Sequence, residues 1–208
     1  MRVIAFGQQK GGVGKSAAAI NLACSAVAHG ETAVIIDMDT DQATSLKWGK
    51  RRNGKPPLVE AADVNRLPVL LKKLREQDVQ WAFIDLPGRS APIAGAGMVA
   101  SDIILIPARP LDIDIEASIT TMQSAIRGSK RYAYLMNISP AQSDKKQARQ
   151  VAAVLERGGH PVIPAIIVQR TIVPNAIAMG KGVNEAEPGG MASKEFAELF
   201  TWLKENVK

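Results

Sequence analysis

The chain has 208 residues, of which 46% are hydrophobic and 22% are charged, a composition typical of one large globular domain, 1–208. Its 26 basic residues outnumber its 20 acidic residues, and the formal net charge of +6 favours a polyanionic partner such as nucleic acid. A single cysteine excludes an intrachain disulfide, and no apolar run approaches the ~20 residues of a membrane-spanning helix. We therefore expect a cytoplasmic protein with no stable membrane association.

Short apolar runs alternate with helix-like segments along the chain, which is the pattern of β-α-β units in a parallel sheet. Several of these runs are apolar throughout, as expected for strands that are covered on both faces. We therefore predict an α/β fold of the doubly wound type, with a mostly parallel sheet and helices on both faces. The predicted strands are residues 3–6, 33–37, 58–61, 81–85, 103–107, 133–137 and 162–168.

Most of the predicted strands are connected by segments in which apolar residues recur at helical spacing. Residues 171–193 are rich in proline and glycine, which indicates a loop or short helices near a functional surface. A last helix is expected at 194–207, and its apolar face either packs on the domain or targets a membrane. Packing is the favoured interpretation, because no flexible linker precedes this segment. The other predicted helices are residues 15–29, 43–51, 65–77, 112–127 and 142–157.

Residues 10–16 read Lys-Gly-Gly-Val-Gly-Lys-Ser and stand between the first predicted strand and the first predicted helix. The general phosphate-binding loop reads G-x-x-x-x-G-K-S/T; Gly14, Lys15 and Ser16 match its end, while Gln9 replaces its first glycine. Lys15 is expected to contact the β- and γ-phosphates, and the Ser16 hydroxyl to ligate Mg²⁺. The alternative is a glycine-rich turn with two solvated lysines. Inward-pointing amides and a helix N-terminus bind phosphate, so the expected nucleotide-binding residues are Gly11, Gly12, Val13, Gly14, Lys15, Ser16 and Ala17.

Acidic residues follow two of the other predicted strands. Asp85 ends an apolar run, where a phosphate site needs a carboxylate to hold Mg²⁺ directly or through water. Asp37 and Asp39 follow the second predicted strand, with Asp41 close behind. A carboxylate near the terminal phosphate can orient the attacking water or accept its proton. The alternatives are a strand-end cap for Asp85 and three solvated acids in a turn for the others.

The lysine at position 10 is not part of the general loop, and K-G-G-x-G-K-S/T resembles the deviant Walker A loop of the ParA/MinD family, closest to the small ParA-type partition ATPases. The resemblance extends over nearly the whole chain and is most specific in its first part. Asp37 and Asp39 match the family's D-x-D-P-Q motif, in which Thr40-Asp41 stands here in place of one proline. The fold that this resemblance implies is that of a P-loop NTPase.

The resemblance also assigns roles to individual residues. Lys15 would serve the nucleotide of its own subunit, and Lys10 would reach the nucleotide of a partner subunit. Asp39 would orient or activate the water that attacks the γ-phosphate, while Asp37 would support the Mg²⁺ shell. The insertion leaves two alternatives open, in which Asp41 takes over or hydrolysis is unusually slow. We therefore expect a Mg²⁺-dependent ATP hydrolase with weak intrinsic activity.

Base recognition and DNA binding are indicated more weakly. The family often has an asparagine at the end of the strand equivalent to residues 133–137, so Asn137 is a candidate adenine contact. No N-K-x-D sequence is present, which favours ATP over GTP. Contacts to DNA phosphates need positive charge but no base readout, although each basic residue alone is also explained as a solvated surface charge. The candidate DNA-binding residues are Arg170, Lys181 and Lys194, and further candidates are Lys145, Lys146 and Arg149.

Taken as a member of this family, the chain is expected to be an ATPase for plasmid or chromosome segregation. ATP would join two protomers into a homodimer that binds DNA non-specifically on the nucleoid, and a ParB-like or other small centromere-binding protein would stimulate hydrolysis. Alternatives are a positioning ATPase for another cargo and a MinD-like membrane-cycling regulator. A metabolic or metal-chaperone P-loop enzyme is a third, which the lone Cys24 argues against.

Overall fold

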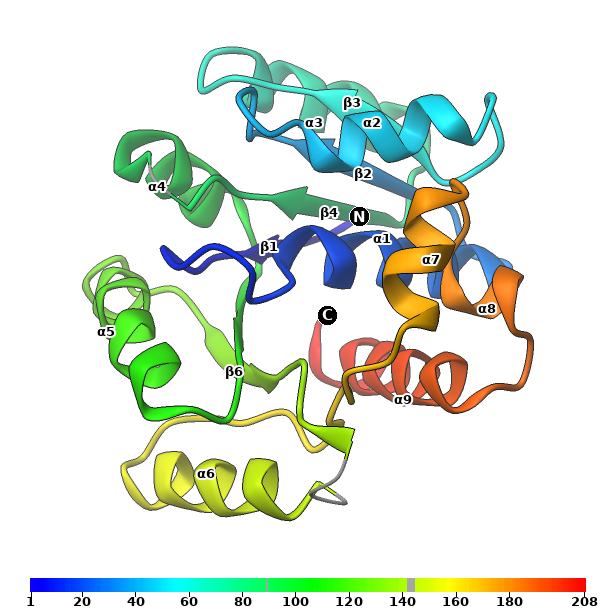
Figure 1. Ribbon diagram of the computed structural model, residues 1–208. Coiled ribbons are helices and arrows are strands. Elements are labelled where there is room, and N and C mark those ends of the chain that lie inside the picture. The colour runs from blue at the N-terminus through cyan, green and yellow to red at the C-terminus, as the bar shows by residue number, and fades with distance from the viewer. Residues whose placement is uncertain (89, 142–144) are drawn as a thin grey trace.

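The computed structural model describes residues 1–88, 90–141 and 145–208 (Figure 1). Its centre is a six-stranded sheet in the order β3-β2-β4-β1-β5-β6, and every neighbouring pair of strands is parallel. This confirms the predicted doubly wound α/β fold. The strands are β1 Arg2–Phe6, β2 Ala33–Asp37, β3 Leu58–Ala61, β4 Trp81–Asp85, β5 Ile103–Ala108 and β6 Tyr132–Met136.

Helices cover both faces of the sheet, as the apolar strands required. α1, α7, α8 and α9 pack with the tryptophan of α2 on one core, while α3, α4, α5 and α6 cover the second core on the opposite face. The helices are α1 Lys15–Ala28, α2 Thr44–Arg51, α3 Arg66–Glu76, α4 Ala91–Ala100, α5 Asp112–Arg127, α6 Lys146–Arg157, α7 Ile172–Ala178, α8 Val183–Ala186 and α9 Met191–Asn206.

β1 shows how one strand supplies both cores. Its residues are almost all apolar, because alternate side chains of a strand point to opposite faces of the sheet. Ile4 and Phe6 lie in the core beneath α1 and α9, and Val3 and Ala5 lie in the core on the other face; all four are fully buried. The strand is therefore fixed at the middle of the sheet, directly before the phosphate-binding loop.

The predicted strand at residues 162–168 is wrong. This segment runs beside β6 but makes only isolated bridges, Val162 with Tyr134 and Val168 with Ser139. Pro164 lies between the two bridges and has no backbone N–H to donate to a ladder. The segment is apolar because Ile163 and Ile167 are buried in the core, and burial rather than regular pairing explains its composition.

Two predicted helices change their bounds, and one observed helix is missing from the prediction. α4 was not predicted, because Gly95, Gly97 and several alanines give it no clear apolar stripe. The helix predicted from residue 142 is observed from Lys146, and its expected first turn at 142–144 lies outside the described residues. The last helix begins at Met191, earlier than predicted.

α9 packs on the domain, in agreement with the favoured interpretation. Phe196, Leu199, Phe200 and Leu203 are at most 1% exposed, so the apolar face is used internally. Among the described residues, no helix has the length and apolar character needed to cross a membrane.

Candidate functional site

The loop between β1 and α1 has the backbone shape that phosphate binding requires. Gly12 and Gly14 have φ angles of 76° and 87°, in the left-handed region that favours glycine. A Cβ on Gly14 would also lie 2.3 Å from the Asn137 side-chain nitrogen. Both strain and space therefore explain the glycine before Lys15, and α1 begins directly after it with its N-terminus toward the loop.

A cavity of about 610 Å³ lies against this loop. Its wall brings Gly11, Gly12, Gly14, Lys15, Ser16 and Ala17 together with the acidic loop after β2. Asp39 and Asp41 both line it, so the two candidate carboxylates for water activation face the phosphate-binding loop. The volume is sufficient for a triphosphate group with solvent, since ligand pockets begin at roughly 300 Å³.

Asp37 and Asp85 lie next to each other at the carboxyl ends of β2 and β4, where the strand register pairs them directly. Both are 1% exposed. Burial raises the pKa of Asp85 to about 6, an effect that the neighbouring charge of Asp37 increases, while hydrogen bonds from Ser16 and Ser45 oppose it. Burial also raises the pKa of Asp37. Two buried carboxylates at paired positions of neighbouring strands favour a bound cation.

These donors fit Mg²⁺. Within the described ranges, no three His, Cys, Asp or Glu side chains form a ready-made metal site. Mg²⁺ does not need one, because it usually keeps several waters and binds one or two carboxylates together with phosphate oxygens. The Ser16 hydroxyl is hydrogen-bonded to Asp85, so hydroxyl and carboxylate already face the same point.

Lys15 lies among these acids. Burial lowers the pKa of its ammonium group, whereas the charges of Asp85 and Asp39 act in the opposite direction. A Cβ on Gly88, in the turn after β4, would come within 3.3 Å of Lys15 Nζ. The turn after β4 therefore packs directly on the lysine, and the loops after β1, β2 and β4 converge on one cavity.

Lys10 is held within its own chain. Its ammonium group forms an ion pair with Asp114, which is fully buried in the first turn of α5. Arg109 binds the same carboxylate, with Nε 2.5 Å from Oδ2. Burial would raise the pKa of Asp114, but the hydrogen bonds from Arg109 and Lys10 lower it overall. No local pattern in the sequence indicates this pairing, because the two partners are 104 residues apart.

Asn137 holds the phosphate-binding loop through a hydrogen bond to its backbone. Its side-chain amide donates a hydrogen bond of 2.7 Å to the carbonyl of Val13, and the residue is 3% exposed. A mostly apolar cavity of about 550 Å³ adjoins it and shares Ala17 with the phosphate-side cavity. The remaining wall includes Ile138, Ile167 and Ile177, which sequence reasoning did not identify. The two cavities together offer a polar space for phosphates and an apolar space for a base.

The three candidate DNA-binding residues lie in different surroundings. Arg170 is engaged by the buried carboxylate of Glu195, with distances of 2.6 and 3.1 Å, and Lys145 binds the same carboxylate at 2.9 Å. Lys194 is exposed on α9, and Lys181 is exposed between α7 and α8. Arg170 is therefore engaged in an ion pair within the chain, whereas Lys181 and Lys194 form none among the described residues.

Comparison with known proteins identifies the family. The sequence profile described as "CobQ/CobB/MinD/ParA nucleotide binding domain" matches residues 4–183. The chain belongs to this family. It is 24% identical to the "Protein ParA" of Rhizobium radiobacter, over 96% of this chain and 94% of that protein. It is 30% identical to "Maintenance of carboxysome distribution protein A" of Gloeobacter kilaueensis, over 80% of this chain and 76% of that protein.

The fold comparison agrees with this assignment. The septum site-determining protein MinD of Pyrococcus horikoshii, solved as a complex with Mg-ADP, superposes with a TM-score of 0.77 at 14% identity, over 98% of this chain and 96% of that one. The ParA/MinD proteins are P-loop ATPases, and the resemblance stated from Lys10 and its loop is therefore confirmed at the level of the family.

Proposed function

We propose that this protein is a ParA-type positioning ATPase that segregates DNA, a plasmid or a chromosome, through an ATP-dependent dimer. One observation carries the proposal: the loop that carries Lys10 and Lys15 places Lys15 in the wall of a cavity that Asp39 also lines, and Asp37 and Asp85 are paired at the ends of the neighbouring strands. The cofactors are ATP and Mg²⁺. The protein acts in the cytoplasm, on the nucleoid, with no stable membrane association.

Within one subunit, each group has a defined task. The amides of the loop and Lys15 hold the phosphates, and Ser16 with Asp85 and Asp37 holds the metal. Mg²⁺ neutralises charge on the β- and γ-phosphates when it is bound. Asp39 orients the water that attacks the γ-phosphate or accepts its proton. Because Asp41 lines the same cavity, it is the second candidate for this task.

Between subunits, Lys10 completes the site. In the single chain it is paired with Asp114 rather than directed into the nucleotide cavity. A partner subunit that brings phosphates close to Lys10 offers it a stronger anion, and the lysine exchanges one ion pair for another. Dimer formation then depends on the nucleotide, because without phosphates no other anion competes with Asp114 for Lys10.

The dimer binds DNA without sequence preference, and a ParB-like or other small centromere-binding partner stimulates hydrolysis and releases it. The net charge of +6 supports a polyanionic partner. A second candidate is the positioning of another cargo. It is favoured by the relative named for carboxysome distribution, which is 30% identical to this chain.

The dimer is tested by light scattering on the purified chain with ATP and with ADP. Wild type should double its mass with ATP only, and Lys10→Ala should remain a monomer. Lys73→Ala, which removes an exposed lysine on α3, is the matched control and should dimerise like wild type. Unchanged dimerisation of Lys10→Ala would exclude the cross-subunit role.

A further inference from the structure

The segment from α2 to β3 carries an unusual concentration of positive charge. Residues 43–59 contain five basic residues and no acidic residue. The pattern within α2 separates them from the core: Ser45 and Trp48 are fully buried, whereas Lys47, Lys50 and Arg51 are exposed. At helical spacing, positions 47, 50 and 51 share one face, so α2 presents a cationic face to solvent.

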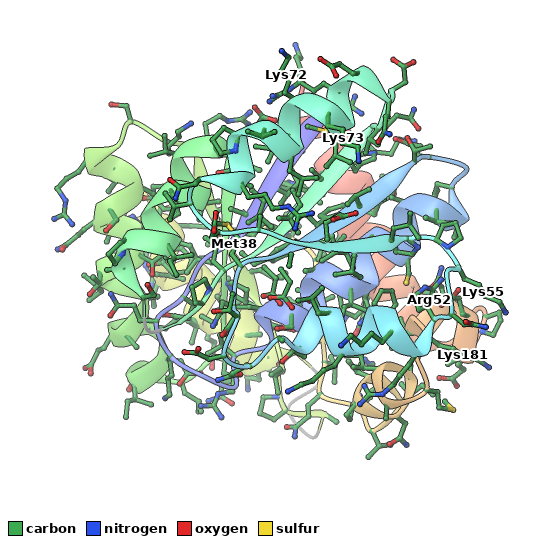
Figure 2. All side chains as sticks on the ribbon, turned by 90° about the horizontal axis from the view of Figure 1, so that it is seen from above. Met38, Arg52, Lys55, Lys72, Lys73 and Lys181 are labelled. Atoms are coloured by element: carbon green, nitrogen blue, oxygen red, sulfur yellow. The ribbon has the colours of Figure 1, made fainter. Side chains whose placement is uncertain are left out.

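Two further lysines extend this face beyond the helix. The guanidinium of Arg52 is buried; it donates to the carbonyls of Lys55 and Gly180 at 3.1 and 2.9 Å and forms an ion pair with Glu185 at 2.7 Å. The Trp48 indole donates to the carbonyl of Lys181 at 3.1 Å. Arg52 and Trp48 therefore bring Lys55 and Lys181 to the end of α2, and Figure 2 shows both lysines beside Arg52.

We name the cationic α2 face by its exposed members, which are Lys47, Lys50, Arg51, Lys55 and Lys181. In the described part of the chain, none of the five forms an ion pair. The carboxylate of Glu185 is already paired with Arg52. Uncompensated cations held on a rigid helix and its adjoining turns attract a polyanion.

The chemistry of this face favours a phosphate backbone over a lipid surface. A helix that lies in a membrane interface needs large apolar side chains beside its cations. The only aromatic residue of α2, Trp48, is 0% exposed and is covered by Arg52, whose guanidinium carbon lies 4.6 Å from the ring centroid. Contacts to DNA phosphates need only well-placed positive charges.

The first turn of α2 is tied to the metal-binding carboxylates. The backbone N–H of Leu46 donates to Asp37 at 2.9 Å, and the Ser45 hydroxyl donates to Asp85 at 2.8 Å. Any movement of these carboxylates toward a bound cation therefore acts on α2 through two short hydrogen bonds. This gives the cationic face a direct connection to the nucleotide site.

We propose that the cationic α2 face binds the backbone of duplex DNA, and that the contacts of Ser45 and Leu46 place it according to the nucleotide state. The inference rests on the proposed function, because it supplies the surface for the non-specific DNA binding described there. It also revises the candidates: Lys181 belongs to the surface, whereas Arg170 is paired with Glu195 and does not.

The test compares two variants with equal loss of charge. Lys50→Gln/Arg51→Gln removes two cations from the cationic α2 face, and Lys72→Gln/Lys73→Gln removes two exposed lysines from α3, which Figure 2 shows away from Lys55 and Lys181. Binding to a fluorescent 30-bp duplex of arbitrary sequence is measured by anisotropy with ATP, across salt concentrations. The thermal unfolding midpoint of each variant verifies that the chain is folded.

The α2 pair should bind at least about tenfold more weakly, and its slope of log affinity against log salt should fall by about 2, since each phosphate contact contributes about 0.9. The α3 pair should stay within about twofold of wild type. If both pairs weaken binding equally, net charge and not this face is responsible, and the inference fails while the proposed function stands. If the wild type binds vesicles with anionic lipid but not DNA, both the inference and the proposed function fail.

Discussion

The two halves of the nucleotide cavity are built in different ways. The phosphate half is formed by short motifs directly after β1, β2 and β4, and the strand register alone brings Asp37 and Asp85 together. The apolar half, which we propose receives the base and call the base half, combines residues from distant parts of the chain, including Asn137, Ile167 and Ile177. The phosphate half therefore depends on a few charged groups, whereas the base half depends on packing. Substitutions in the phosphate half should mainly change ATP affinity, and substitutions beside the base half should mainly change stability.

The largest expected effect is in the phosphate half. Lys15→Ala removes the half-buried ammonium group that we propose binds the phosphates, and a charge-assisted hydrogen bond contributes about 3 kcal/mol at most. ATP affinity should therefore fall about 100-fold in titration calorimetry, with little change in the thermal midpoint. A loss of less than about threefold would show that the phosphates do not lie against Lys15.

A smaller effect, on stability rather than affinity, is expected beside the base half. Glu195→Gln leaves Arg170 and Lys145 without their buried carboxylate, and should reduce the free energy of unfolding by about 2 kcal/mol at pH 7. Although burial acts to raise the pKa of Glu195, hydrogen bonds from Arg170 and Lys145 lower it overall. Because the pKa of Glu195 is lower in the folded state than in the unfolded state, the carboxylate stabilises the fold at pH values above its unfolded-state pKa. This contribution is lost as the pH falls through the folded-state pKa.

The measurement for Glu195 is urea unfolding of wild type and Glu195→Gln between pH 7 and pH 3. The difference in unfolding free energy should be constant from neutral pH down to about 4.5, the ordinary pKa of a glutamate side chain, and should then shrink. A difference that grows with acidity would contradict the assigned role of the carboxylate.

The smallest effect on stability is expected at Asn137, which lines the base half and binds the phosphate-binding loop. Asn137→Ala leaves the Val13 carbonyl without its partner, which should cost about 1–2 kcal/mol of stability and loosen the phosphate-binding loop. The matched double variant Gly14→Ala/Asn137→Ala removes the 2.3 Å clash but keeps the left-handed φ of 87°. It should be about 1 kcal/mol less stable than Asn137→Ala alone. Equal stability of the single and double variants in urea unfolding would show that the loop does not retain this conformation.

The sequence predicted those parts of the fold and site that local patterns encode. Six of the seven predicted strands are observed, the phosphate-binding loop connects β1 to α1, and Asp85 is the last residue of β4. Local patterns could not separate a buried irregular segment from a strand at 162–168, because both are apolar. They also did not indicate α4, whose small residues give it no apolar stripe.

Several of the contacts that sequence reasoning missed join residues far apart in the chain. Asp114 binds Lys10, and Arg52 organises the turn that carries Lys181, across separations of more than 100 positions. Glu195 and Arg170 lie on different elements as well. Such pairings follow from the tertiary arrangement, and no periodicity or motif in one part of the chain specifies them.

The proposed ATP-dependent binding of DNA is measured with the wild-type chain and duplex DNA, with ATP, with ADP and without nucleotide, over a range of salt concentrations. The chain should bind with ATP only, and its affinity should fall steeply as salt increases, because released counterions drive the association. Binding that is equal in all three states, or absent with ATP at low salt, would contradict the proposal.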